Sequence, residues 1–278
     1  MNLDKFAKEI RIALLEELMA SKGGHIGGSL SIVAVLAVLY GKQCKHNPID
    51  PNWKDRDYVI LSKGHAGPAL YATLACRGYF DSHQLMTLNQ GGTLLPSHPD
   101  RLKIKGVDMT TGSLGQGSSV AAGLAFDIHQ VESHQYVYTI LGDGELNEGQ
   151  NWEAFSFIAH HNLHQCILFV DNNKKQLDGY TTEINCLQSL TDKFRSFGFN
   201  CIEVDGSSCH AIDCAIELAK SKKDKPTCIL LDTIKGSGIE YFENLYANHS
   251  VKFQDKENAI IRNEIVRLKE EVAGEVNV

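Results

Sequence analysis

Hydrophobic and polar positions follow two patterns along the chain. A three- to four-residue period predicts helices, and short continuous apolar runs predict strands. Between Leu3 and Ala20 apolar residues recur at three- and four-residue steps, which is typical of an amphipathic helix packed on a core. A second, apolar helix is expected to be capped by Ser29 and to run to Tyr40. The pattern further predicts a short strand at 58–61 and helices at 66–77 and 116–129.

From residue 136 onward, short apolar runs alternate with helical stretches. The pattern predicts strands at 136–141, 165–170, 200–204 and 227–233 and helices at 148–161, 187–197, 209–220 and 255–271. Strands that alternate with helices indicate an α/β fold, a mostly parallel sheet with helices on both faces. No linker-like break interrupts the chain, so we expect a single domain over residues 1–278.

Composition and charge narrow the possible partners. The 278 residues include 27 Lys and Arg against 34 Asp and Glu, and this acidic balance argues against a nucleic-acid partner. The longest apolar run, 32–40, is too short to span a bilayer, and the charged N-terminus does not resemble a signal peptide. The eight Cys lack zinc-site spacing, so we expect reduced thiols in a cytoplasmic protein.

Two polar motifs follow neighbouring predicted strands. GDGELNEG at 142–149 and VDNNKKQLDG at 170–179 each begin where a strand ends, and parallel strands place such ends side by side. Asp143 and Asn173 can then face one spot, where a carboxylate, an amide oxygen and a loop carbonyl suit Mg²⁺ or Ca²⁺. A lone GDG is most often a turn, but the two motifs together favour a metal site whose glycines admit a diphosphate.

The motifs also resemble a known family. GDG followed by NN resembles the signature that binds thiamine diphosphate, and four further segments resemble the transketolase family. They are GGHIGGSLS at 23–31, HNP…W…RD at 46–57, LSKGHAGPALYATL at 61–74, and LPSHPD with TTGSLGQG at 95–117. The resemblance extends from about Arg11 to His249 and implies the thiamine-diphosphate-binding fold of that family.

The resemblance implies a cofactor site for thiamine diphosphate and Mg²⁺, for which Ca²⁺ or Mn²⁺ can substitute. Asp143 and Asn173 match the side-chain metal ligands, and Lys175 matches a ligand that uses its backbone carbonyl. The positions that match cofactor contacts are His65 and Gly144 at the diphosphate, Gly112, Ser113 and Leu114 along the aminopyrimidine ring, and His249 over the diphosphate.

Three histidines match catalytic positions of the family. His25, His98 and His249 are implied to face the substrate and to assist proton transfer, for which a near-neutral pKa is suited. Lys235 matches a basic position near the site without a defined role. The other histidines, at 46, 83, 129, 134, 160, 161, 164 and 210, are expected to be structural or on the surface.

Two acids after the GDG motif have a structural interpretation, and for Glu148 a second interpretation stays open. Glu145 and Glu148 could be first-turn acids that stabilise a helix N-terminus, while the family places the position of Glu148 near a subunit interface.

The implied activity is transfer of a two-carbon ketol unit from a ketose to an aldose. Transketolases carry a second, pyrimidine-binding domain with an activating glutamate, and we expect a separate C-terminal subunit to supply it in a heterotetramer with two copies of each chain. Three departures from the usual transketolase pattern leave the identity of the sugars open, and sugar phosphates and modified sugars both remain candidates. The chain has PSHP at 96–99 where the family commonly has PGHP, Ser250 after His249 where it commonly has glycine, and no arginine at 86–92.

Three alternatives stay open at this point. The chain could be the α subunit of a 2-oxo-acid dehydrogenase, or resemble deoxyxylulose-phosphate synthase, and so serve a decarboxylating enzyme. It could also be a non-catalytic subunit that binds the cofactor. A plain nucleotide-binding fold is disfavoured, because GSLGQG at 112–117 lacks both the Rossmann spacing and a preceding strand.

Overall fold

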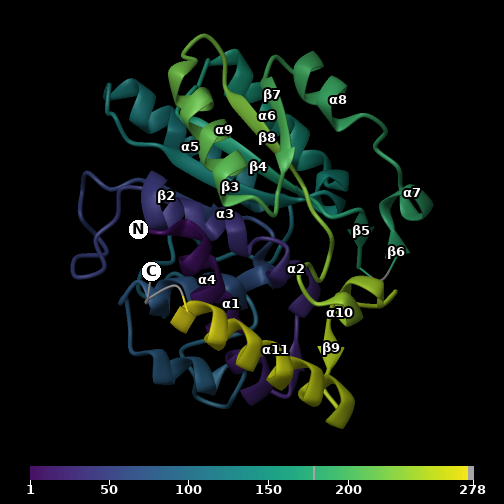
Figure 1. The fold of residues 1–278 in the computed structure, drawn as a ribbon. Coiled ribbons are helices and arrows are strands. Elements are labelled where there is room, and N and C mark those ends of the chain that lie inside the picture. The colour runs from purple at the N-terminus through teal and green to yellow at the C-terminus, as the bar shows by residue number, and fades with distance from the viewer. Residues whose placement is uncertain (178, 275–278) are drawn as a thin grey trace.

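A five-stranded parallel sheet forms the centre of the molecule (Figure 1). The computed structural model describes residues 1–177 and 179–274. The strand order is β2-β3-β4-β8-β7, with bounds β2 Tyr58–Leu61, β3 Val137–Gly142, β4 Cys166–Asn172, β8 Thr227–Asp232 and β7 Asn200–Asp205. All neighbouring strands are parallel, so their carboxyl ends share one edge. The predicted α/β class is confirmed.

Successive strand side chains point to opposite faces, and each face has its own core. On β4, Ile167 and Phe169 join one core, whereas Leu168 and Val170 join the other. The first core packs under α1 Leu3–Ala20, α3 Val33–Val38, α4 Gly67–Cys76 and α9 Cys209–Ser221, with α11 Asp255–Gly274 lying on α1. The second packs under α5 Gln116–Gln130, α6 Gly149–His160 and α8 Leu190–Ser196.

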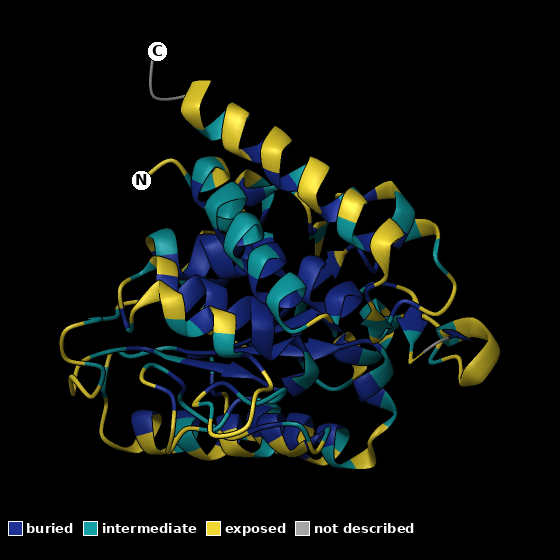
Figure 2. Cartoon of the chain, turned by 90° about the horizontal axis from the view of Figure 1, so that it is seen from below, coloured by how far each residue is buried: buried dark blue, intermediate teal, exposed yellow. Residues whose placement is uncertain are grey.

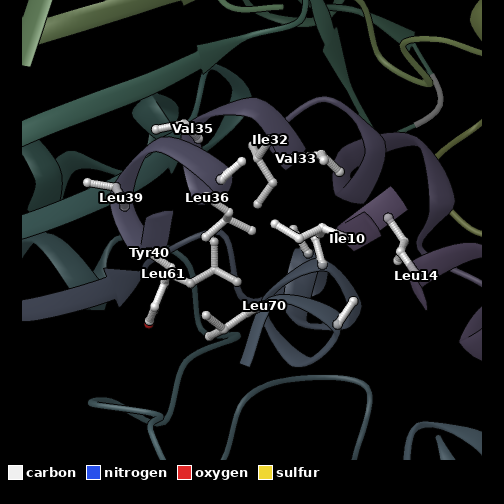
Figure 3. Packing of buried hydrophobic residues seen from close by; sticks show 14 of the residues in the cluster. Ile10, Leu14, Ile32, Val33, Val35, Leu36, Leu39, Tyr40, Leu61 and Leu70 are labelled. Atoms are coloured by element: carbon white, nitrogen blue, oxygen red, sulfur yellow. The ribbon is translucent and has the colours of Figure 1, made fainter. Parts of the chain in front are cut away.

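The buried residues concentrate between these layers. Figure 2 shows them in the middle of the molecule, while exposed residues lie on the outer sides of the helices. In the first core, Ile10 and Leu14 of α1 pack near Leu36 of α3 and Leu70 of α4 (Figure 3). Both cores are almost entirely apolar, so the few charged residues buried beside them need a separate explanation.

The predicted helix from Ser29 to Tyr40 is wrong in its start and its continuity. Helix α2 already begins at Ile26 and ends at Leu30, α3 follows after a break, and the π-helical turn η1 Leu39–Gln43 completes the segment. Gly27 lies in the first turn of α2, where a Cβ would lie 2.3 Å from the carbonyl oxygen of Asn248. Ser29 is therefore a buried residue inside α2 and not its cap.

Short elements escaped prediction because they are too short for a hydrophobic pattern to repeat clearly. They are β1 Gly23–Gly24, η2 Gly64–Ala66, η3 Ser82–Thr87, η4 Gly144–Asn147, β5 Lys175–Gln176, β6 Gly179–Tyr180, α7 Thr181–Ile184, α10 Glu240–Asn244 and β9 Val251–Lys252. Among the helices of the described residues, none has both the length and the hydropathy to cross a membrane.

Candidate active site

Four histidines from distant parts of the chain meet beside the carboxyl edge of the sheet. The ring centroid of His25 lies 5.1 Å from that of His249, 5.5 Å from His98 and 5.9 Å from His65, and the rings of His65 and His249 are 4.8 Å apart. The structure thus brings together the four histidines that the sequence selected. Their individual roles stay predictions.

A two-residue ladder holds His25 beside His249. Strand β1 pairs antiparallel with β9, so the residues that precede His25 lie against those that follow His249. Gly23 has a φ of 134°, and a Cβ there would lie 2.3 Å from the carbonyl oxygen of Val251. Only glycine permits this close backbone approach.

Glycines also fit closely around the other two rings. Gly112, with a φ of 134°, would place a Cβ 2.9 Å from the ring of His98, and Gly28 would place one 2.9 Å from Nε2 of His65. The backbone N–H of Thr111 donates to the carbonyl of Pro99 at 3.2 Å, which ties the loop of Gly112 to that of His98. The glycine-rich motifs therefore bring the backbone close to the histidines.

The surroundings of the histidines favour the neutral imidazole. Burial lowers the pKa of His25 to about 4, and His98 and Lys235 add to that effect. Burial, and then the charge of Lys63, lower the pKa of His65 well below its ordinary value, and burial also lowers the pKa of His98. At neutral pH each of these rings therefore has one nitrogen that donates a hydrogen bond and one that accepts a hydrogen bond.

The predicted metal ligands lie at the ends of β3 and β4. Asp143 is 5% exposed, and its carboxylate accepts the backbone N–H of Gly144 at 2.8 Å and of Lys174 at 2.7 Å. The amide oxygen of Asn173 accepts the backbone N–H of Lys175 at 3.1 Å. The ammonium of Lys175 donates to the carbonyl of Leu245 at 2.9 Å, so it is occupied elsewhere, as a ligand that uses its backbone carbonyl requires.

The charge around Asp143 fits a divalent cation. Burial raises the pKa of Asp143 to about 7, and the neighbouring carboxylate of Asp171 contributes in the same direction. A cation at this carboxylate would offset both effects. The described residues hold no cluster of three His, Cys, Asp or Glu side chains for a metal ion, but Mg²⁺ takes few protein ligands and completes its shell from phosphate and water.

Asp143 can also be reached from outside. It lines a cavity of about 360 Å³ between the strand ends and the segment 181–191, together with Lys174 and Asp232. The small exposed fraction of Asp143 therefore does not close it off from a ligand.

A buried network beneath the site was not foreseen. Lys63 is 1% exposed and forms an ion pair with Asp171, which is fully buried. A charged residue between the apolar run of β4 and the NN motif was the signal in the sequence that could have revealed Asp171. Lys63 lay inside the KGHAG motif, but nothing in the sequence connects two residues so far apart.

Glu145 has a further role besides the expected one. It lies in η4, is 2% exposed, and accepts the backbone N–H groups of Gly115 and Gly142, each at 3.0 Å. It is the acidic residue in the first turn of η4, as expected, and it also fixes the TTGSLGQG loop to the end of β3. Glu148 is an exposed residue at the start of α6 whose side chain makes no capping hydrogen bond.

Lys235 lies beside the histidines. It is 2% exposed, donates to the carbonyl of Leu177 at 2.6 Å, and its ammonium is 3.4 Å from Nδ1 of His249.

Three other histidines lie away from the site. The rings of His160 and His161 are 4.8 Å apart on the surface side of α6, and a ring nitrogen of His46 forms a hydrogen bond with the carbonyl of Tyr40 at 2.9 Å.

Comparisons with known proteins agree with this geometry. The profile described as "Transketolase, thiamine diphosphate binding domain" matches residues 3–269. The 6-deoxy-6-sulfo-D-fructose transketolase subunit SqwG of Clostridium sp. (strain MSTE9) is 48% identical to the chain, over 92% of this chain and 93% of that protein. An apulose-4-phosphate transketolase subunit from Actinobacillus succinogenes is 37% identical, over 87% of each.

Solved structures show the same fold. Transketolase from Leishmania mexicana superposes with a TM-score of 0.86 at 29% sequence identity, over 99% of this chain and 46% of that one. The chain therefore spans less than half the length of this transketolase, but nearly the whole length of the two proteins named as subunits.

Proposed function

The chain belongs to the transketolase family, and from that premise we propose that it is the diphosphate-binding subunit of a two-subunit transketolase. The observation that carries the proposal is the convergence of His25, His65, His98 and His249 beside Asp143 and Asn173, in a chain that matches transketolase subunits along most of their length. The reaction breaks the C2–C3 bond of a ketose and joins the two-carbon unit to the aldehyde carbon of an aldose.

The polar groups at the strand ends would hold the cofactor and its metal. We assign Mg²⁺ to the carboxylate of Asp143, the amide oxygen of Asn173 and the backbone carbonyl of Lys175. His65 and the backbone of Gly144 would hold the diphosphate, and Gly112, Ser113 and Leu114 would contact the aminopyrimidine ring. Thiamine diphosphate, when bound, supplies the nucleophilic carbon that carries the two-carbon unit.

The histidines would move protons at the substrate. His25 and His98, which the protein keeps neutral, accept and donate protons at the sugar hydroxyls, and His249 closes over the diphosphate and substrate. Neighbouring ring centroids lie 4.8–5.9 Å apart, so one substrate at this cluster would be within reach of several rings.

The partner would be a separate subunit with the pyrimidine-binding domain and the activating glutamate. We propose a heterotetramer in which residues 1–278 form one domain of each diphosphate-binding chain. The names of the two relatives as subunits support a partner, and the eight free cysteines fit the reducing cytoplasm.

The donor is proposed to be a ketose with a terminal anionic group. By its name, the Clostridium protein acts on a sulfonated fructose, and the Actinobacillus protein acts on a phosphorylated sugar. The identity of 48% favours the sulfonated sugar as the first donor to test.

Reconstitution with a pyrimidine-domain subunit tests the proposal. The complex should release an aldose two carbons shorter than 6-deoxy-6-sulfo-D-fructose when an aldose acceptor, Mg²⁺ and thiamine diphosphate are present. Asp143→Asn should lose most of this activity, and the chain alone should show little. Release of CO₂ from pyruvate without ketol transfer would instead assign a decarboxylating enzyme, and cofactor binding without turnover of either substrate would assign a non-catalytic subunit.

A further inference from the structure

We propose that Asp171, held by Lys63, is a positioning residue that sets the orientation of the Asn173 side-chain amide, so that its oxygen faces the metal ion. This inference rests on the proposed function, because it takes Asn173 as a metal ligand. It concerns Asp171 and Lys63, neither of which is itself placed at the metal or the substrate.

Asp171 accepts hydrogen bonds from side chains of four separate segments. Its carboxylate accepts the hydroxyl of Ser31 at 2.6 Å and the amide nitrogen of Asn173 at 2.8 Å, and it also contacts the hydroxyl of Thr233 and the ammonium of Lys63. These donors come from the end of α2, the end of β4, the end of β8 and the segment after β2. Asp171 therefore joins the parts of the chain that surround the candidate metal site.

The contacts of Asn173 leave its amide one orientation. An ionised carboxylate only accepts hydrogen bonds, so the side of the amide that faces Asp171 must be the NH₂ group. On the other side, the backbone N–H of Lys175 donates to the amide at 3.1 Å, so that side must be the oxygen. This oxygen keeps a second lone pair, which is the one available to a metal ion.

Lys63 makes the arrangement possible in the interior. A carboxylate that is fully buried is costly unless a cation and hydrogen bonds compensate it, and the ammonium of Lys63 is the cation in contact with Asp171. The ammonium is itself enclosed, since a Cβ at Gly28 would lie 3.4 Å from Nζ of Lys63. Lys63 is therefore held at Asp171 beneath the histidine cluster.

Exchange of the two side chains tests the orientation. Asn173→Asp removes the NH₂ group and sets two carboxylates against each other. A carboxylate is ordinarily a good Mg²⁺ ligand, yet we expect this variant to bind metal at least about tenfold more weakly. The double variant Asp171→Asn/Asn173→Asp restores one donor and one acceptor across the contact at unchanged net charge. It should bind metal within about threefold of the original protein.

The measurement uses Mn²⁺ as the probe, followed by electron paramagnetic resonance on the reconstituted complex with thiamine diphosphate. Asn172→Asp is the matched control, because it makes the same chemical change one residue away at a partly exposed position, and it should leave Mn²⁺ affinity within about threefold. Thermal unfolding of each variant shows that the chain is folded.

The outcomes separate the inference from the proposed function. If folded Asn173→Asp binds Mn²⁺ as tightly as the original protein, the orienting role is overturned while the proposed function stands. The same holds if the folded double variant binds as weakly as the single variant. If the original complex fails to bind Mn²⁺ with thiamine diphosphate, the proposed metal site falls, and the inference falls with it.

Discussion

Two lysine–aspartate ion pairs lie at the same edge of the sheet and have opposite surroundings. Lys63 and Asp171 are 1% and 0% exposed, whereas Lys174 and Asp232 are 51% and 72% exposed. The two pairs are close in the fold, because Asn172, the neighbour of Asp171, is in register with Asp232 across β4 and β8. The two pairs therefore share a location in the sheet and differ strongly in burial.

Burial changes what a charge pair contributes. At an exposed pair, water screens the attraction and the flexible side chains lose entropy, so the pair adds little to stability. At a buried pair, each partner depends on the other, because a single charge left in the interior has no solvent to compensate it. The Lys63–Asp171 pair can therefore fix positions at the site, while the Lys174–Asp232 pair cannot.

The largest expected effect comes from removal of the buried cation. Lys63→Met leaves the buried carboxylate of Asp171 without its cation, so we expect the free energy of unfolding to fall by about 3–5 kcal/mol in urea denaturation. The double variant Lys63→Met/Asp171→Asn buries no charge and should recover at least half of the loss. A loss below about 1 kcal/mol for the single variant would show that burial does not distinguish the two pairs.

The Lys63–Asp171 ion pair is also an example of a contact that the sequence could not predict. Helix α1 was predicted from its helical period and strand β4 from its continuous apolar run, and Asp143 and Asn173 were predicted because strand ends meet in a parallel sheet. Contact between Lys63 and Asp171 depends on how two distant segments pack, and no local pattern encodes that.

The contact of Gly27 in α2 with Asn248 escaped prediction for the same reason, since the two residues are distant in the sequence. Local rules therefore predicted the layers and placed Asp143 and Asn173 at neighbouring strand ends, but they did not predict the contacts that hold these residues in place.

A buried acid without a cation gives the second prediction. Glu17 of α1 is fully buried, and its carboxyl oxygens have no hydrogen-bond partner among the described residues, unlike those of Asp171. Burial raises the pKa of Glu17 well above its usual value of 4.5, so the folded protein keeps the proton while the unfolded chain releases it. Stability is then lost as the pH rises above about 4.5.

Glu17→Gln removes this ionisation in the unfolded chain. We expect a gain of about 2–3 kcal/mol in the free energy of unfolding at pH 7, which disappears toward pH 4. Glu16→Gln is the matched control on the solvent side, where Glu16 pairs with Lys269, and it should change stability by less than about 0.5 kcal/mol. An equal gain at both pH values would contradict the assignment of a buried, neutral Glu17.

The third prediction concerns the histidine next to the buried pair. Burial, followed by the charge of Lys63, lowers the pKa of His65, so the unfolded chain takes up a proton below pH 6.5 that the folded protein does not. Stability from this group is present above pH 6.5 and is lost as the pH falls. Between pH 7 and pH 5, His65→Asn should lose about 1–2 kcal/mol less than the original protein. Equal losses in urea denaturation for the variant and the original protein would refute a neutral His65.

The smallest effect is expected at the exposed pair. Asp232→Asn keeps the size of the side chain and the backbone carbonyl of residue 232, which accepts the N–H of Gly206 at 2.9 Å, and it removes only the charge that faces Lys174. The free energy of unfolding should fall by less than about 0.5 kcal/mol, and this difference should shrink as NaCl rises from about 0.05 to 0.5 M. The loss caused by Lys63→Met should not change over that range, because mobile ions do not reach a pair enclosed by protein. If the two losses respond to salt alike, the buried pair is open to solvent, and its hold on Asn173 would be no stronger than that of a surface contact.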